Sequence, residues 1–118
     1  MSPLTHSYYS GASDAQIIYE TIGSYFDKIA DVHSMNPALV VRHQGVNWTY
    51  GELKARVDRL AVGLIQLGIE PGDRVGIWGP NSSEWVLVQL ATAKIGAIMV
   101  CINPAYRLYE LEYARNKV

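Results

Sequence analysis

The stretch GDRVGIWGPNSSEWVLVQLATAKIGAIMVCINP, residues 72–104, decides the fold. Two short apolar runs, at 72–78 and 97–102, flank an apolar segment long enough for a helix. The second run has no polar alternation, a pattern typical of a strand covered on both faces in a parallel sheet. Two strands joined by such a helix form a parallel crossover, which is almost always right-handed. The stretch predicts an α/β fold with a parallel βαβ sheet flanked by helices.

The helix inside this stretch has its own start and stop signals. Asn81 is followed three residues later by Glu84, which matches a capping box and predicts a helix that begins near Ser82. Apolar residues between 85 and 95 wrap most of its circumference, so we expect it to be covered on several sides. Gly96 can adopt the left-handed conformation that ends a helix.

A tail and a helix are predicted upstream. Residues 1–20 are predicted to form an N-terminal tail, of which residues 17–19 lie extended on the body. Thr21 is a candidate N-cap for the next helix, and Asn36-Pro37 marks the end of that segment. We therefore expect residues 21–118 to form one truncated subdomain.

A β-hairpin and a second helix are predicted between them. ALVVR at 38–42 and VNWTY at 46–50 flank a turn in which Gly45 supplies a positive φ angle. Thr49 and Glu52 form another capping box, which opens an amphipathic helix of about five turns. The fold class is therefore α/β with a β-hairpin beside the parallel unit.

Two of these segments resemble motifs of a known family. WTYGEL at 48–53 resembles the first core motif of the AMP-forming acyl-CoA synthetases, and ATAKIGAIMVCINP at 91–104 resembles the second. These enzymes belong to the adenylate-forming superfamily. The resemblance extends from about Thr21 to Val118, and it identifies the chain as an N-terminal fragment of an AMP-binding domain.

The resemblance implies a parent enzyme that is an ATP-dependent fatty-acid:CoA ligase. Such an enzyme joins a carboxylate to AMP, and CoA then displaces AMP to give a thioester. It would use ATP, Mg²⁺, CoA and a fatty acid. The family's phosphate loop, magnesium ligand and ribose-binding acid have no match in this sequence. We therefore expect no catalytic, cofactor-binding or metal-binding residue here, and no turnover by the 118-residue chain alone.

Composition excludes several other classes of partner. Ten basic and eleven acidic residues are scattered along the chain, which leaves no basic patch for nucleic acid or anionic lipid. The longest apolar run is too short for a membrane span, and the first twenty residues lack the pattern of a secretory signal. Cys101 is the only cysteine, so no internal disulfide is possible. We expect a cytoplasmic location.

Residues that could carry chemistry have simpler explanations. Cys101 lies in an apolar strand that would raise its thiol pKa, so we expect a buried core residue instead of a nucleophile. Gly76 and Gly79 lack the third glycine of a dinucleotide fingerprint. The histidines have no metal-ligand spacing, so we expect them to be solvated surface residues. The aromatic residues have no interleaved basic residues for stacking bases, so we expect them to be core and subdomain-contact residues. These residues are His6, His33, His43, Trp48, Trp78, Trp85, Tyr106, Tyr109 and Tyr113.

The segment 103–107 is a candidate for a functional role, because it follows the carboxyl end of a predicted parallel strand, where open α/β sheets have their ligand crevices. Arg107 has two explanations: an ion pair with a part of the parent outside this chain, or a surface pair with Glu110 or Glu112. Those two acids lie two apart on a predicted last helix, so they face different ways and do not form a cooperating pair. We expect Glu110 and Glu112 either to form the solvent-exposed polar surface of that helix or to stabilise its first turn.

Two alternatives to a structural fragment without activity of its own remain. Strand edges and the apolar helix at 82–95 would favour self-association as a homo-oligomer if nothing covers them. A dinucleotide-binding Rossmann-like domain is disfavoured by the missing glycines.

Overall fold

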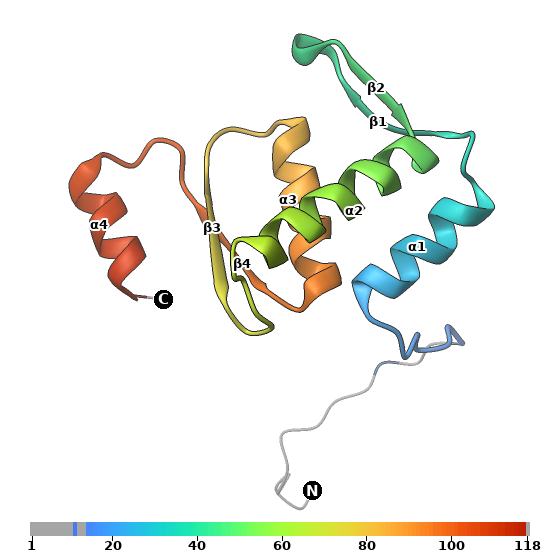
Figure 1. Ribbon diagram of the computed structural model, residues 1–118, viewed down its shortest axis with the longest axis horizontal. Helices are drawn as coiled ribbons and strands as arrows, with labels where there is room; N and C mark the ends of the chain where they lie inside the picture. The colour runs from blue at the N-terminus through green and yellow to red at the C-terminus, as the bar shows by residue number, and fades with distance from the viewer. Residues whose placement is uncertain (1–10, 12–13, 118) are drawn as a thin grey trace, which may run out of the picture.

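Helix α1 (Ile22–Val32), helix α2 (Tyr50–Gln66) and helix α3 (Ser83–Ile95) pack side by side in the computed structural model, which describes residue 11 and residues 14–117 (Figure 1). Small side chains at their contacts let the helix axes approach closely. The amphipathic pattern predicted for α2 is confirmed, since its buried stripe faces α3. The buried apolar residues of this core are Ala30, Leu53, Val57, Ala61 and Ala91.

The predicted parallel unit is confirmed. Strand β3 (Arg74–Trp78) and strand β4 (Ile98–Ile102) are hydrogen-bonded in parallel, with α3 as the crossover between them. Their register runs without a break from the pair Arg74 and Ile98 to the pair Trp78 and Ile102. Residues paired in this way share one face of the sheet, and their chain neighbours share the other.

The prediction that β4 is covered on both faces is wrong for this chain. Within the described residues β3 is the only strand paired with it, and α3 packs against one side of the pair, whereas α4 stands apart on the other side (Figure 1). Trp78 and Ile98, on the face away from α3, each keep 49% of their surface exposed. Cys101 is exposed as well, contrary to expectation, and β3 is the only strand that pairs with β4 in the part of the chain that the structure describes. The apolar run of β4 is therefore only partly buried in this chain.

The start of α3 differs in detail from the predicted capping box. Ser82 is the N-cap, and its hydroxyl accepts a hydrogen bond from the Trp85 backbone N–H at 3.3 Å. With Ser82 as the N-cap, Glu84 occupies the second helical position and not the third that a capping box needs, and its carboxylate binds a residue of the hairpin described below. At the other end, Gly96 has φ 76° and ends the helix in the left-handed conformation, as predicted.

The β-hairpin and its downstream helix form as predicted. Strand β1 (Pro37–Val41) pairs antiparallel with strand β2 (Val46–Thr49). A short 3₁₀ turn, η1 (Arg42–Gln44), joins them, and Gly45 has φ 65°. At the end of β2, Thr49 and Glu52 form both hydrogen bonds of the capping box that begins α2.

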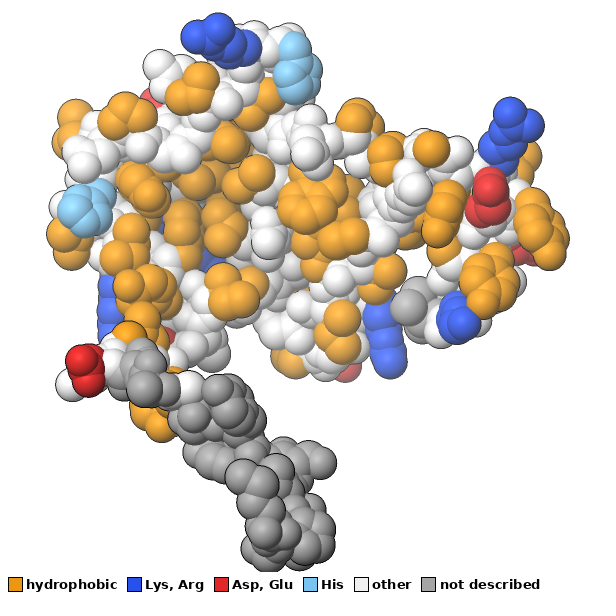
Figure 2. Space-filling view, turned by 180° about the vertical axis from the view of Figure 1, so that it is seen from behind, with side chains coloured by type: hydrophobic (Ala, Val, Ile, Leu, Met, Phe, Trp, Pro, Cys, Tyr) orange, Lys and Arg blue, Asp and Glu red, His pale blue; other side chains and the backbone are white. Residues whose placement is uncertain are grey.

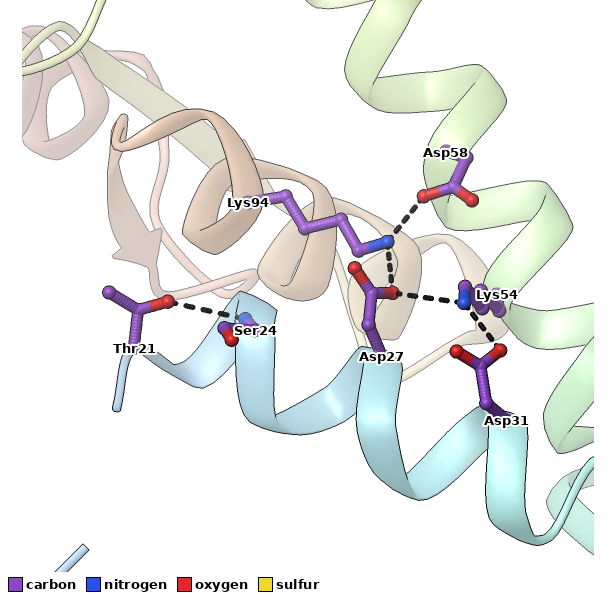
Figure 3. Close-up of polar contacts among 7 residues, drawn as sticks. All are labelled: Thr21, Ser24, Asp27, Asp31, Lys54, Asp58 and Lys94. Carbon is purple, nitrogen blue, oxygen red and sulfur yellow. Dashed lines mark hydrogen bonds and ion pairs between the residues drawn. The ribbon is translucent and has the colours of Figure 1, made fainter. Parts of the chain in front are cut away.

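Thr21 caps α1 as predicted, accepting the Ser24 backbone N–H at 3.2 Å (Figure 3). The segment before it does not lie on the body: Ile17, Ile18 and Tyr19 are all exposed, so that prediction is wrong. Residues 1–10 and 12–13 of the predicted tail, including His6, lie outside the described residues.

Helix α4 (Leu108–Lys117) follows a turn after β4 and has no buried residue. The Glu110 carboxylate accepts the Arg107 backbone N–H at 2.7 Å, so it holds the first turn of α4, one of the two roles predicted for it. Leu108, Tyr109 and Tyr113 are exposed. Local capping and helix propensity therefore form α4, with little help from packing.

Five charged side chains join the three packed helices (Figure 3). Lys94 of α3 binds Asp27 of α1 at 2.5 Å and also binds Asp58 of α2. Lys54 of α2 binds Asp31 at 2.5 Å and lies 3.9 Å from Asp27. Burial lowers the pKa of Lys94, but the hydrogen bonds to both carboxylates outweigh it and leave the pKa above its ordinary value. The charges alternate in sign across the junction, so each helix is tied to the other two.

Candidate functional site

A crevice of about 530 Å³ lies beyond the carboxyl ends of β3 and β4. This is the edge of a parallel sheet where ligands of open α/β folds bind. The structure brings the loop after β3 and the loop after β4 together here, although they are more than twenty residues apart in sequence. The crevice is lined by Gly79, Pro80, Asn81, Trp85, Cys101, Ile102, Asn103 and Pro104.

Asn103 and its neighbours form a turn. The side-chain oxygen of Asn103 accepts the Ala105 N–H at 2.9 Å, and its backbone oxygen accepts the Tyr106 N–H at 3.0 Å. The side chain mimics a backbone turn, which lets the chain leave β4 sharply. Its oxygen therefore holds the loop.

Arg107 contributes neither to the crevice nor to the surface ion pair considered from the sequence. Its backbone N–H binds Glu110, but among the residues that the structure describes its guanidinium pairs with neither Glu110 nor Glu112. An ion pair with a part of the parent outside this chain stays a prediction.

The chemistry of the crevice lining is neutral. No charged side chain is among the residues that line it. A triphosphate and its magnesium need cationic donors and carboxylate ligands, so this lining does not fit either group. Cys101 reaches the crevice, but no histidine or carboxylate lines it to take the thiol proton. The geometry provides a shaped surface without acid–base groups.

The remaining sequence candidates do not converge. His33 stacks obliquely near Tyr50, with ring centroids 6.4 Å apart, whereas His43 lies in η1 at the hairpin tip. Within residues 14–117, no three histidine, cysteine or acidic residues are grouped to hold a metal ion. Arg56 lies over the Trp48 ring at 4.3 Å. Trp78 lies on the open sheet face and is half exposed, so it is not a core residue of this chain. Its predicted role as a subdomain contact stays a prediction.

A feature that sequence reasoning missed joins the hairpin tip to the start of α3. The Gln44 amide donates to the Glu84 carboxylate at 2.7 Å, and its carbonyl oxygen accepts the Ser83 backbone N–H at 2.7 Å. The Ser83 hydroxyl contacts the same carboxylate at 3.3 Å. We call this set the Gln44 clamp. Its members are about forty residues apart, and a lone glutamine in a turn gives no sequence signal.

The clamp lowers the pKa of Glu84 to about 2, chiefly through the Gln44 hydrogen bond and then through the backbone of Glu84 itself. A carboxylate with a lowered folded-state pKa stabilises the fold above its unfolded value of about 4.5 and loses that contribution as the pH falls toward 2. The clamp is therefore expected to be acid-sensitive.

Replacing Glu84 with Gln tests this link. Above pH 5 the variant is expected to unfold at a lower urea concentration than the wild type, and the difference should shrink between about pH 4.5 and 2. Urea midpoints of both proteins from pH 6 to pH 2 measure it. Glu112→Gln, at an exposed position on α4, is the matched control and should show no such trend. A wild-type advantage that persists unchanged at pH 2 would contradict the assignment.

Comparison with known proteins agrees with this architecture. The model of the family "AMP-binding enzyme" matches residues 26–118. The medium-chain acyl-CoA ligase ACSF2, mitochondrial, of Rattus norvegicus is 46% identical over 112 residues, which are 95% of this chain and 18% of that protein. The putative acyl-CoA synthetase YngI of Bacillus subtilis is 40% identical over 99 residues, 84% of this chain and 18% of that protein. This chain thus spans less than one fifth of the length of these relatives.

Solved structures show the same fold. A Mycobacterium tuberculosis fatty acyl CoA synthetase superposes with a TM-score of 0.76 and 34% identity over 79% of this chain and 18% of that chain. The Klebsiella oxytoca NpsA N-terminal subdomain gives 0.75 and 28% over 81% of this chain and 25% of that chain. The resemblance inferred from WTYGEL and ATAKIGAIMVCINP is confirmed. The chain belongs to the AMP-binding enzyme family and has the fold found in the N-terminal subdomains of adenylate-forming enzymes.

Proposed function

We propose that this chain is the N-terminal structural subdomain of an ATP-dependent fatty-acid:CoA ligase, with residues 21–118 as scaffold and residues 1–20 as a tail. The observation that carries the proposal is the 46% identity over 112 residues to the rat medium-chain acyl-CoA ligase. The whole enzyme would convert a carboxylate and ATP into an acyl-adenylate and pyrophosphate. The thiol of CoA would then displace AMP.

On this proposal, the 118-residue chain has no turnover of its own. The supporting observation is the neutral lining of the crevice at the sheet edge, which does not fit ATP or Mg²⁺. Activation of a carboxylate requires cationic groups that neutralise phosphate charge while the mixed anhydride forms. On this proposal ATP, Mg²⁺, CoA and the fatty acid are ligands of the whole enzyme, and this chain is part of its structural scaffold.

A chimera tests the proposal. In the rat ligase, the segment that matches this chain over 112 residues is replaced by the corresponding residues of this chain. We expect acyl-CoA formation from decanoate, ATP and CoA within about tenfold of the rat enzyme, because a scaffold exchanged as a unit leaves the reacting groups in place. A chimera that melts cooperatively but forms no acyl-CoA would overturn the proposal.

We also propose a cytoplasmic location for this chain. Within the described residues, none of the helices has the length and apolar character needed to cross a membrane. The rat relative is named as mitochondrial, so fractionation of cells that express the chain distinguishes the two compartments. Recovery with a matrix marker would contradict the proposal.

Self-association is a second candidate function, favoured by the half-exposed Trp78 and Ile98 on the open sheet face. A parallel pair with an unpaired edge can add a strand from another chain. Sedimentation velocity from micromolar to millimolar chain concentration decides: a rising sedimentation coefficient supports it, and a constant monomer value rejects it.

A further inference from the structure

Residues 16–19, which we call the pre-helix segment, form an exposed apolar stretch directly before α1. Ile17, Ile18 and Tyr19 keep 74%, 57% and 89% of their surface exposed. Figure 2 shows hydrophobic side chains where the described part of the tail joins the body. The pre-helix segment belongs to no helix or strand, and among residues 14–117 its backbone N–H and C=O groups have no hydrogen-bond partner. Both its side chains and its backbone are therefore free to bind another surface.

The residue types of the pre-helix segment favour a β-strand. Isoleucine and tyrosine are enriched in strands, and the segment contains no glycine, proline or charged residue. The nearest charge, on Glu20, is already paired with Lys28 at 2.7 Å. Four residues at about 3.3 Å each nearly match the length of β4, which has five residues.

Strand β4 provides an edge to which such a strand can add. It pairs with β3 on one side, and within the described residues no strand pairs with its other side. Edge strands are commonly protected by charged side chains or proline. β4 has neither, whereas β3 carries Arg74. Ile98 and Cys101 of β4 are exposed. The free edge of β4 is thus neutral and unprotected, like the pre-helix segment itself.

A second copy of the chain is the partner that satisfies both elements. Within one chain the pre-helix segment and β4 are not hydrogen-bonded to each other. Two copies that exchange their segments form a closed, symmetric contact in which each copy is both donor and acceptor. A buried tyrosine alone covers about 150–250 Å². Three large side chains from each copy, with the edges they cover, approach the roughly 1,200 Å² of a small specific interface.

We propose that two copies of the chain exchange their pre-helix segments, each of which adds as a third strand to the free edge of β4 in the other copy. Main-chain hydrogen bonds then provide affinity, and the alternating side chains provide specificity. The inference rests on the self-association candidate under the proposed function, and it names the two elements that meet.

Sedimentation velocity of two matched variants tests the exchange. Ile18 and Ile65 are both 57% exposed, but Ile65 lies on α2, away from both elements. Ile18→Lys should raise the dimer dissociation constant at least about tenfold, because a lysine opposes strand addition, whereas Ile65→Lys should leave it unchanged. Circular dichroism confirms that both variants are folded. A wild type that stays monomeric would reject self-association as a whole. Dimerisation that Ile18→Lys leaves intact, or that both variants weaken equally, would reject the exchange alone.

Disulfide cross-linking locates the contact, because Cys101 is the only cysteine and lies exposed in β4. Single cysteines are placed along the pre-helix segment and oxidised with oxidised glutathione, and non-reducing gels show the linked chains. Side chains of a strand alternate between its faces, so dimers linked to Cys101 should form at every second position. Cys101→Ser in the same variants should abolish them. Equal cross-linking at every position, none at any, or a disulfide within one chain would overturn the proposal. The variants are Gln16→Cys, Ile17→Cys, Ile18→Cys and Tyr19→Cys.

Discussion

Replacing Gly23 with Leu is expected to lower the free energy of unfolding by about 3 kcal/mol or more. Gly23 is buried in the first turn of α1, where the helix crosses α3. A Cβ at this position would lie 2.9 Å from the Cα and 3.0 Å from the Cγ of Lys94. Backbone cannot move aside as a flexible side chain can, so α1 must shift away from α3.

Gly63→Leu is the matched control. Gly63 is also helical, in α2, but nothing lies within 4 Å of a Cβ built on it. Because Leu favours helix over Gly by somewhat less than about 1 kcal/mol, this variant should be neutral or slightly stabilised. Urea unfolding followed by circular dichroism measures both. A Gly23→Leu protein as stable as Gly63→Leu would show that α1 and α3 do not meet as described.

Replacing Lys94 with Met is expected to lower the free energy of unfolding by about 1–3 kcal/mol. Met keeps most of the apolar stem but removes the ammonium group that Asp27 and Asp58 share. The two carboxylates then lose their common partner and repel each other. Because both remain partly exposed, the loss is smaller than for a fully buried pair.

The pH dependence of this effect has a defined sign. The pKa of Lys94 is raised in the folded chain above its ordinary 10.5. Its contribution is therefore fully present below pH 10.5 and disappears as the pH rises through the folded-state pKa. The stability gap between wild type and Lys94→Met should be constant from pH 7 to 9 and narrow above pH 10.5.

Lys28→Met is the control for this experiment. Lys28 also forms an ion pair, with Glu20 at 2.7 Å, but 62% of its side chain is exposed. A surface pair of this kind contributes little, so the change should stay within about 0.5 kcal/mol. If Lys28→Met and Lys94→Met destabilise the chain equally, the junction of α1, α2 and α3 does not depend on the Lys94 contacts.

The sequence signals that predicted this fold correctly are local. Thr21, Thr49 and Glu52 cap their helices through neighbours three residues away, and Gly45 and Gly96 adopt the conformations expected of them. Each of these features depends only on adjacent residues, so a pattern in the sequence is sufficient. The crossover from β3 through α3 to β4 follows in the same way from two apolar runs and their separation.

The features that sequence missed depend on distant or absent neighbours. An apolar run predicts a strand that can be buried, but whether Cys101 is buried depends on what packs against that part of the sheet, and among residues 14–117 it stays exposed. The spacing of Asn81 and Glu84 predicted a capping box, but the Glu84 carboxylate binds Gln44. The two residues are forty positions apart, so no local pattern in the sequence indicates this contact.

The chain combines a well-packed helical core with an exposed sheet face and an exposed last helix. The core of α1, α2 and α3 is satisfied internally, since Val57 and Ala91 are fully buried and the charges at the junction are paired. Trp78 on the open sheet face is half exposed, and no described residue of helix α4 is buried. A domain with its own core and one open apolar face is suited to support a larger assembly.

Calorimetric titration of the 118-residue chain with Mg-ATP tests the central claim, that this chain is scaffold without the groups needed for adenylation. The crevice at the sheet edge has no charged lining residue, so the expected result is no saturable heat of binding up to millimolar nucleotide. Saturable binding of one Mg-ATP per chain at micromolar concentration would contradict the claim.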